Sequence, residues 1–452
     1  MAGLVTTRAL LRRGLAVTLL EADDRWGGVV RTVRESGFLF DAGPDSMLAQ
    51  KPEGVALCRE LGLGDRLLPT NTNVRTVYVL HRGRLHPMPE GMVLGVPTRM
   101  WPLAFSSLFS WPGKLRMGLE PFVPRRREAG DESIAAFIER RLGREALERL
   151  AEPLLGGIHA GDPARLSMRA TFPRMIEMEQ KHGSLLRGMR AASRHGGGSA
   201  FVSLQGGMSE LVEALVASIP AEARFAGAAV TALAREDDGF VVETAASRWR
   251  ARAVVVAAPP PRASALMERI LPEAAALLGG IGFASTATVM AGFRREDVAH
   301  ALDGYGLVVP RREGRHTLAC TFVSTKLAGR APEGHVLLRG FLGGVRDAAI
   351  LDGDDAALAR VVLDEMTPVL GLRGAPLFTR VFRWRGVTPQ MEVGHGERVA
   401  AIEARLPSVP GLFVTAAGFR GAGLPDVIAD AQRTAEAVGA YVEGRRLAGV
   451  SA

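Results

Sequence analysis

Apolar and polar residues at the start of the chain follow first a helical and then a strand spacing. Residues 2–13 have apolar side chains at helical intervals, and residues 15–20 form a short apolar run that ends at Glu21. A helix, a buried strand and a carboxylate form the second half of a nucleotide-binding βαβ unit. We therefore expect a Rossmann-like α/β domain without its first strand, because no apolar run precedes the helix.

The same domain is expected to draw on the middle and the end of the chain. The pattern predicts a loop, a glycine pair and an amphipathic helix at 201–219, a hairpin at 228–244, and a buried strand at 251–261 that ends at prolines. Residues 415–438 are predicted to form a strand, a glycine-rich turn and a helix. The nucleotide-binding domain is therefore predicted to be discontinuous.

Two insertions interrupt this domain. Residues 88–195 are mostly helical in pattern, whereas 265–394 alternate short apolar strands with turns, which predicts a sheet-based substrate domain. The uncharged stretch 274–293 is rich in Gly, Ser and Thr, so we expect a turn into a buried strand rather than a membrane span. The expected division is a nucleotide-binding domain at 1–73, 200–264 and 395–447, a substrate domain at 74–87 and 265–394, and a helical domain at 88–199.

The most apolar part of the helical insertion is 91–115, which contains Trp101, Phe105, Phe109 and Trp111. Such a stretch forms either a lid over a hydrophobic pocket or a helix that lies in a membrane interface. Arginine and lysine are sparse there, so we favour the lid and keep weak membrane-surface contact through 91–115 as the alternative.

Composition and charge narrow the class of protein. The 452 residues are 47% hydrophobic and 23% charged, which is typical of a globular protein. The net charge is +8, but no basic run exceeds Arg125–Arg127, so a nucleic-acid partner is not expected. The isolated Cys58 and Cys320, and histidines without metal-ligand spacing, predict neither a disulfide nor a metal site. Without a signal-peptide pattern, we expect a cytoplasmic protein that is at most peripheral to a membrane.

The glycines and the acidic residue near the start predict a dinucleotide site. Gly3 lies 18 positions before Glu21, close to the spacing of about 20 between the third Rossmann glycine and the ribose-binding carboxylate. Arg25, Gly27 and Gly28 follow, and a glycine pair lets the backbone approach a diphosphate beside a cationic side chain. Residues 21–28 reproduce the ExxxRxGG pattern of flavoproteins of the amine oxidase type, which favours FAD over NAD.

A second glycine-rich turn lies near the end of the chain. Gly418, Gly421 and Gly423 precede a helix whose N-terminus is expected to face an anion, with Asp426 in its first turn. Turns of this type at both ends predict one FAD site assembled from distant parts of the sequence.

Six longer segments indicate a family. They are GPDS (43–46), LHPMPEGMVLGVPTRM (85–100), EPLLGGIHAGDPARLSMRATFP (152–173), EQKHGSLLRGM (179–189), RWRGVTPQMEVGH (383–395) and GFRGAGLPDVI (418–428). Together they resemble the FAD-dependent, oxygen-using porphyrinogen oxidases of haem biosynthesis, over almost the whole chain. The LHPMPEG, LFS and EPLLGGI stretches are more similar to bacterial coproporphyrinogen III oxidases than to protoporphyrinogen IX oxidases.

The resemblance implies roles for individual residues. It implies that the adenosine ribose is held by Glu21 and Ala22, that adenine meets the backbone of Val230, and that the isoalloxazine lies beside Trp384. The flavin would be faced by Gly43, Pro44, Asp45 and Ser46 and closed over by Ala422, Gly423 and Leu424. His159 and Met391 stand where the family usually has tyrosine.

The resemblance also implies a reaction. Coproporphyrinogen III would lose six hydrogens to give coproporphyrin III, by three hydride transfers to the flavin, with O2 as acceptor and H2O2 as product. Protoporphyrinogen IX is the alternative substrate. No general base is singled out by the sequence, and Arg75, Arg187 and Arg380 are candidates for binding substrate propionates.

Two other hypotheses remain open. An amine oxidase or carotenoid desaturase of the same architecture is disfavoured, because Tyr78, Tyr305 and Tyr441 are the only tyrosines available for an amine-binding aromatic cage. An inactive or flavin-free tetrapyrrole-binding copy would follow from the missing first strand and its glycine loop. On that basis the 452-residue form is expected to be poorly soluble and to lose flavin.

Overall fold

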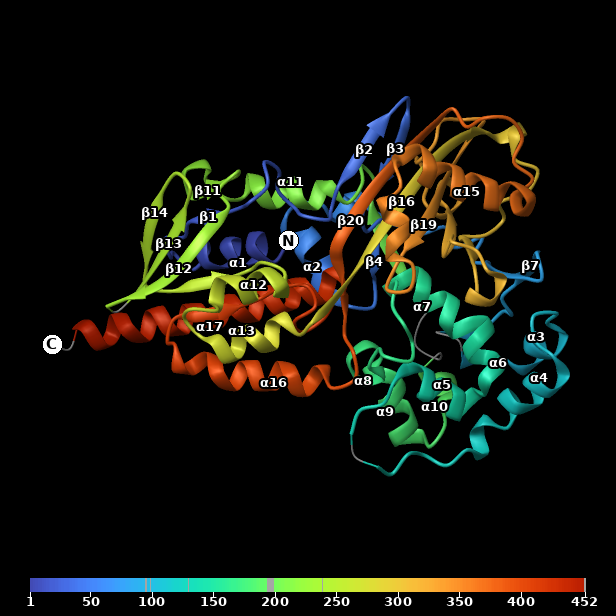
Figure 1. Ribbon diagram of the computed structural model, residues 1–452, viewed down its shortest axis with the longest axis horizontal. Helices are drawn as coiled ribbons and strands as arrows, with labels where there is room; N and C mark the ends of the chain where they lie inside the picture. Colours follow the sequence, from blue (N-terminus) through green and yellow to red (C-terminus); the bar gives the residue numbers. More distant parts are fainter. Residues whose placement is uncertain (94–95, 98, 129, 193–198, 238, 451–452) are drawn as a thin grey trace.

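The computed structural model describes residues 1–93, 96–97, 99–128, 130–192, 199–237 and 239–450. Its elements form three groups, which Figure 1 shows as a layered α/β part on the left, a large sheet at the upper right and a bundle of short helices at the lower right. The expected α/β fold class, with a large mixed sheet and a helical insertion, is confirmed.

A mixed seven-stranded sheet forms the second group. Its spatial order is β20, β16, β19, β18, β17, β6 and β7, and every pair is antiparallel except β17 with β6. The helix α15 (Asp355–Leu370) packs against it over a continuous apolar core. The strands, in sheet order, are Phe378–Gln390, Gly282–Arg294, His335–Gly343, Ala319–Phe322, Gly306–Val308, Val77–His81 and Arg84–Pro87.

The first group contains several small sheets between helices. Two are parallel pairs, β1 (Leu19–Leu20) with β11 (Arg224–Phe225) and β15 (Val254–Val256) with β21 (Leu412–Val414). The antiparallel ladders are β4 (Met47–Leu48) with β10 (Phe201–Leu204) and β5 (Leu67–Pro69), and β12 (Val230–Glu236) with β13 (Gly239–Thr244) and β14 (Arg248–Ala251). The hairpin of β2 (Thr32–Glu35) and β3 (Phe38–Asp41) lies beside the large sheet, where Phe38 and Phe40 pack with Met290 and Leu337.

Helices from both ends of the chain pack together around these strands. The long C-terminal helix α17 (Leu424–Val450) lies against α1 (Ala2–Leu11), as Figure 1 shows. The remaining helices of this group are α2 (Pro52–Glu60), α11 (Ser209–Ala217), α12 (Pro260–Met267), α13 (Pro272–Gly279) and α16 (His395–Arg405).

Several predicted elements differ from the structure. The strand expected over 15–20 is limited to Leu19–Leu20, because among the described residues only these two find a ladder partner, in β11. The loop expected at 201–204 is the strand β10, since it is paired on both sides by distant segments. The stretch 274–293 is the end of α13 followed by β16, not only a turn into a strand.

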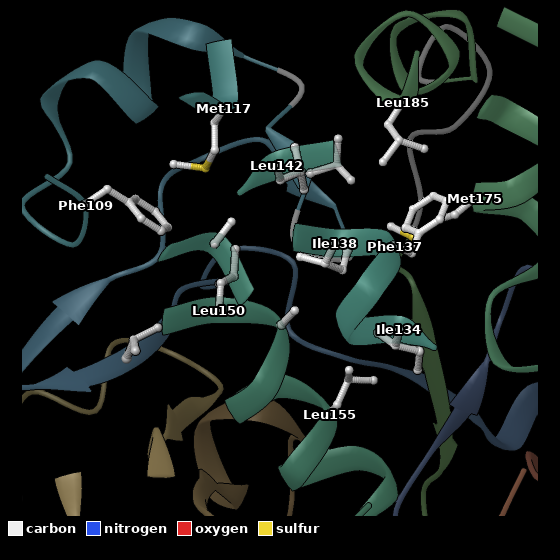
Figure 2. Close-up of a cluster of buried hydrophobic side chains, with 14 of the residues drawn as sticks. Phe109, Met117, Ile134, Phe137, Ile138, Leu142, Leu150, Leu155, Met175 and Leu185 are labelled. Atoms are coloured by element: carbon white, nitrogen blue, oxygen red, sulfur yellow. The ribbon is translucent and has the colours of Figure 1, made fainter. Parts of the chain in front are cut away.

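The third group is a bundle of short helices around its own apolar core, which Figure 2 shows. A π-helical turn at Leu147–Ala151 ends two residues before Pro153, whose missing N–H interrupts the regular hydrogen-bond ladder. The helices are α3 (Met100–Phe105), α4 (Trp111–Gly118), α5 (Ile134–Leu142), α6 (Arg144–Ala146), α7 (Glu152–His159), α8 (Met168–Thr171), α9 (Pro173–His182) and α10 (Leu185–Ala192), with a short hairpin of β8 (Met92–Val93) and β9 (Val96–Pro97).

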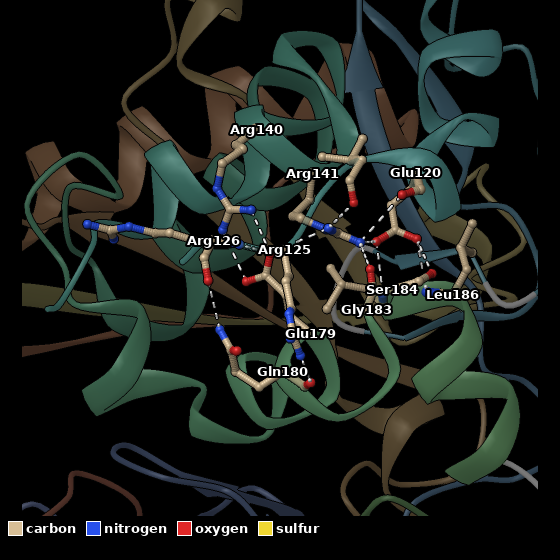
Figure 3. A network of polar contacts seen from close by, with 12 residues as sticks. Glu120, Arg125, Arg126, Arg140, Arg141, Glu179, Gln180, Gly183, Ser184 and Leu186 are labelled. Atoms are coloured by element: carbon tan, nitrogen blue, oxygen red, sulfur yellow. Dashed lines mark hydrogen bonds and ion pairs between the residues drawn. The ribbon is translucent and has the colours of Figure 1, made fainter. Parts of the chain in front are cut away.

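A fully buried ion pair joins the helices of this bundle (Figure 3). Arg141 on α5 donates to Glu120, and both side chains are 0% exposed. The Glu120 carboxylate also accepts from Ser184 Oγ at 2.6 Å and from the backbone N–H groups of Leu185 and Leu186. The Glu120 carboxylate thus joins the turn that follows α4 to α5 and to the start of α10.

The aromatic residues of the stretch 91–115 do not form the expected lid. Phe109 is buried in the bundle core, whereas Trp101, Phe105 and Trp111 are 76%, 81% and 74% exposed. Side chains exposed to that extent cover no pocket, and residues 94, 95 and 98 of the stretch lie outside the described residues. In the described part of the chain, no helix has both the length and the apolarity to cross a membrane.

Candidate functional site

Glu21 follows β1 directly, and its main chain is held by a neighbouring segment. The N–H of Ala228 donates to the Glu21 carbonyl at 2.8 Å, and the Glu21 carboxylate accepts from the N–H of Asp23 at 3.1 Å. Val230 begins β12 two residues after Ala228, and Ala22 is exposed beside the carboxylate. The structure thus places Glu21, Ala22 and Val230 around one edge of the parallel strands.

Gly3 lies in the first turn of α1, where the helix crosses two strands closely. A Cβ on Gly3 would be 3.3 Å from Leu19 Cδ1 and 3.5 Å from Ala257 Cβ. A side chain here would press the helix away from β1 and from the end of β15. This contact matches the packing role of the third glycine in a Rossmann unit.

The two glycines after Glu21 serve different purposes. Both have left-handed backbone, with φ +101° at Gly27 and +59° at Gly28. A Cβ on Gly27 would be 2.8 Å from a methyl of Val212 on α11, whereas a Cβ on Gly28 would meet nothing within 4 Å. Gly27 is therefore required for packing, and Gly28 leaves open space along the turn.

The Arg25 side chain stabilises this turn by hydrogen bonds to its backbone. Its guanidinium donates to the carbonyl oxygens of Trp26 at 3.4 Å, Val30 at 3.2 Å and Gly28. Arg25 was predicted to lie beside a diphosphate, but its guanidinium donates to the backbone of the turn itself. Its charge remains at the turn, while its donors fix the turn's shape.

Gly43 brings the start of the segment 43–46 against the turn. A Cβ on Gly43 would be 1.8 Å from the carbonyl oxygen of Val29 and 3.8 Å from Trp384 Cζ2. No other residue fits between these two neighbours without displacing backbone. Gly43 and Trp384, predicted to lie beside the same ring system, are therefore adjacent in the structure.

The residue before this segment is anchored on the large sheet by one carbonyl oxygen. Ala42 O accepts from Thr288 Oγ1 at 3.0 Å, Arg339 Nη2 at 3.2 Å and Trp384 Nε1 at 3.1 Å. These donors come from β16, β19 and β20, so three strands fix the position of the segment. The same bond orients the indole of Trp384.

Asp45 is the centre of a buried charge cluster. Its carboxylate accepts from Lys326 Nζ at 2.8 and 2.9 Å and from Ser46 Oγ at 2.7 Å, with Arg339 Nη1 at 3.9 Å. Burial by itself would raise the pKa of Asp45, but Lys326 and Arg339 hold that pKa well below its usual value. Asp45 is therefore ionised at every physiological pH.

A second buried carboxylate, Asp41, lies next to this cluster. Its Oδ1 accepts from Thr32 Oγ1 at 2.6 Å and from the N–H of Met208 at 2.8 Å, while Oδ2 is buried without a hydrogen-bond partner. Burial raises the pKa of Asp41, opposed by these hydrogen bonds and by Arg330, whose Nη2 is 3.9 Å from Oδ2. Arg330 itself is held by the carbonyls of Leu204 and Gln205.

Three cations of these clusters, Lys326, Arg330 and Arg339, were not predicted from the sequence. Arg339 carries the one available signal, since an arginine inside the apolar run VLLRGFL of a strand must be buried with a partner. Lys326 and Arg330 stand in a polar stretch that gives no such sign.

The C-terminal glycine turn packs against the end of β20. Gly418 has φ +84°, and its Cβ would be 2.4 Å from Pro389 Cβ. The N–H of Gly418 donates to the carbonyl of Gly421 at 2.7 Å, and His395 Nε2 donates to the carbonyl of Phe419 at 3.0 Å. The turn is thus closed on itself and joined to α16.

Beyond this turn, Ala422, Gly423 and Leu424 lead into α17. Gly423 is exposed, and Leu424 is the first residue of the helix. Asp426 lies in the first helical turn, as expected, where it pairs with Lys51 at the start of α2. This pair ties α17 to the segment that follows Ser46.

The helical bundle meets the large sheet at His159, the last residue of α7. The carbonyl of His159 accepts from Gln390 Nε2 at 2.9 Å, at the end of the strand that carries Trp384. Burial lowers the pKa of the His159 imidazole to about 4, so the ring is neutral at neutral pH. Met391, the other position where tyrosine was expected, is buried next to Gln390.

The predicted arginines differ in their surroundings. Arg380 pairs with Glu35 at the far end of β20, and Arg75 donates to the carbonyl of Thr72 at 3.1 Å. Arg187 is exposed on α10.

One hydrophobic core unites the segments predicted to bind the nucleotide. It contains Leu4, Val30, Met47 and Val427, with Leu424 packed against it. The predicted contacts follow one another from Val230 and Glu21, past Gly28, to Gly43 and Trp384. This order fits an elongated dinucleotide that has a ribose at one end and a planar ring at the other. The open space at Gly28 and the indole of Trp384 beside Gly43 fit such a molecule as well.

Known proteins share this sequence and architecture. Residues 1–439 match the family model described as flavin containing amine oxidoreductase. The chain is 36% identical to a coproporphyrinogen III oxidase of Bacillus subtilis, over 92% of this chain and 89% of that protein. It is 34% identical to a coproporphyrinogen III oxidase of Propionibacterium freudenreichii, over 96% and 88%. A crystal structure from Exiguobacterium sp. 255-15, provisionally named a protoporphyrinogen oxidase, is similar at 32% identity and a TM-score of 0.87, over 97% and 96%.

Proposed function

The chain belongs to the flavin-containing amine oxidoreductase family, and from this premise we propose that it oxidises coproporphyrinogen III to coproporphyrin III with FAD, using O2 and releasing H2O2. The enzyme class, a flavin-dependent oxidase, follows from the family. The observation that carries the choice of substrate is the similarity to bacterial coproporphyrinogen III oxidases along nearly the whole chain.

FAD as the particular flavin is supported by residues on both sides of the diphosphate position. The ribose would be held by Glu21, the diphosphate by backbone N–H groups at Gly28 and at the start of α17, and the ring by Gly43 and Trp384. When bound, the flavin supplies the hydride acceptor and the route of electrons to O2. The chain's own contribution is to orient that ring through the Ala42 carbonyl and its three donors.

Substrate choice is tested with the two porphyrinogens. The purified protein is mixed under air with coproporphyrinogen III or protoporphyrinogen IX, and porphyrin fluorescence and H2O2 are recorded. We expect faster turnover of the tetra-propionate substrate and one H2O2 for each two hydrogens removed. Preference for protoporphyrinogen IX, the substrate implied by the name of the Exiguobacterium protein, would transfer the proposal to that substrate.

The tyrosines give no support to an amine oxidase. Tyr78 Oη donates to Asp303 at 2.7 Å, Tyr305 Oη donates to the carbonyl of Asn71 at 2.5 Å, and Tyr441 packs edge-on against Phe413. An amine-binding cage built from tyrosines would have to recruit side chains that are already engaged elsewhere in the fold.

Peripheral contact with an anionic membrane is part of the proposal. Trp101, Phe105 and Trp111 are exposed on the consecutive helices α3 and α4, with Trp101 stacked on Phe105, and membrane-interface helices are rich in such side chains. In the described part of 99–127 the only acidic residue is Glu120, which is buried against Arg141, so the exposed charges here are basic. This combination suits a surface of acidic lipids.

Vesicle sedimentation tests this contact. The wild-type protein should pellet with phosphatidylglycerol vesicles more than with phosphatidylcholine vesicles, and a Trp101→Ser/Phe105→Ser/Trp111→Ser variant should not pellet. Phe225→Ser, at an exposed position in β11, is the matched control and should behave as wild type. Equal recovery of wild type and triple variant in the supernatant would refute the contact.

A further inference from the structure

A buried cluster of charges behind the segment 43–46 contains more cations than carboxylates. Lys326 and Arg339 approach Asp45, and Arg330 approaches Asp41. Glu210 and Arg34 also act on Arg330, and their opposite charges balance each other. With every group ionised, the three cations therefore face two carboxylates, which leaves one net positive charge. Such a surplus is unusual inside a protein, because each buried charge without a partner is costly.

The surplus charge lies directly against the backbone of the segment. Arg339 Nη2 donates to the carbonyl of Gly43 at 2.7 Å as well as to that of Ala42, and Lys326 Nζ is 3.3 Å from Ser46 Oγ. The side chains of Lys326 and Arg339 are 15% and 7% exposed. Water screens charges at such sites weakly, so they act strongly on whatever lies on the other side of the segment.

We propose that Lys326, Asp45 and Arg339 set the reduction potential of the bound flavin. The inference rests on the proposed function, which places the ring against Gly43. Taking up a hydride adds negative charge to that ring, and a fixed positive charge nearby favours the reduced form. The three residues are positioning groups that act through charge. Asp45 offsets one of the two positive charges, so the three together carry one net positive charge.

Opposite charge changes at this pair give opposite expected results. Asp45→Asn removes a negative charge and should raise the potential, and Lys326→Met removes a positive charge and should lower it. Each single variant is expected to change the ratio of reduced to oxidised flavin at least tenfold at a fixed potential, about 30 mV for a two-electron couple. The double variant restores the charge balance and should return close to the wild-type potential.

The measurement is an anaerobic dye-equilibration titration of each protein at saturating FAD, after its FAD dissociation constant has been determined. Lys181→Met, an exposed lysine on α9, is the control and should leave the potential unchanged. Shifts of the same sign in both single variants, or none, would overturn the inference and leave the cluster a purely structural support. If Lys326→Met does not fold, the near-isosteric Asp45→Asn decides, because only the charge mechanism predicts a higher potential for it. Failure of the wild type to bind FAD or to oxidise a porphyrinogen would instead refute the proposed function.

Discussion

Replacing Gly43 by alanine tests the geometry of the site most directly. The added Cβ would lie 1.8 Å from the carbonyl oxygen of Val29 and 2.9 Å from its carbonyl carbon. Both atoms belong to backbone, so no side chain can rotate to make room. The segment that begins at Gly43 must therefore move by about 1 Å or more to reach an acceptable contact.

The cost of that movement can be assembled from two contributions. Forcing a methyl into a packed site costs about 1–3 kcal/mol. Movement also weakens the bonds to the Ala42 carbonyl, and each hydrogen bond contributes about 1 kcal/mol. The total is about 3 kcal/mol. A cost of this size in the conformation that binds the flavin weakens FAD binding by more than about a hundredfold.

Flavin content after gel filtration, measured from the ratio of visible to ultraviolet absorbance, reports the effect. Gly43→Ala should emerge nearly colourless, with a raised FAD dissociation constant in fluorescence titration. Gly156→Ala is the matched control: this glycine lies in α7 with an ordinary helical backbone and nothing within 4 Å of its Cβ position. The control should keep full flavin and gain about 0.5–1 kcal/mol of stability. Wild-type FAD affinity in Gly43→Ala would refute the proposed position of the ring.

Three further predictions concern single side chains. Glu21→Gln should weaken FAD retention on dialysis by about tenfold, because a charge-assisted bond to ribose contributes about 1.5–3 kcal/mol; unchanged flavin content would remove Glu21 from the site. Glu120→Gln removes one of the two carboxylates that pair with the buried Arg141, whose other partner, Glu179, lies 3.4 Å away. The change should cost about 1.5–3 kcal/mol, measured as a lower urea midpoint; Glu128→Gln, at an exposed pair, should change nothing measurable. His159, with a pKa of about 4 in the folded protein against about 6.5 when unfolded, takes up its proton more readily in the unfolded chain. Stability should therefore fall as pH drops from about 6.5 to 4, by about 2–3 kcal/mol. His159→Tyr should reduce this loss, and an identical pH dependence in that variant would contradict the assignment.

Sequence patterns and resemblance predicted much of the architecture. Helix α1, the hairpin of β12 and β13, the glycine turn before α17 and the helical insertion were all expected from apolar spacing and turn residues. These features depend on neighbours within a few positions, which is why one sequence is enough to predict them. The residue roles at the flavin site came from resemblance and remain predictions.

The pairing of β10 could not be predicted in the same way. Residues 201–204 look like a loop, but they form a strand because Met47–Leu48 and Leu67–Pro69 supply partners on either side. A ladder between segments more than a hundred positions apart depends on the fold of everything between them. The aromatic residues of 91–115 were misplaced for a related reason, since an apolar sequence does not tell which side faces the core.

The α/β class, the two glycine turns and the carboxylate after β1 were predictable from sequence patterns, because each depends on local backbone preferences. The groups that surround the segment 43–46 depend instead on the packing of distant parts of the chain. The carbonyl of Ala42 meets donors from three strands, and Asp45 meets Lys326 from 281 positions away. Such contacts arise from the register of distant strands, and the energy of a buried charge depends on the groups packed around it, not on its neighbours in the chain.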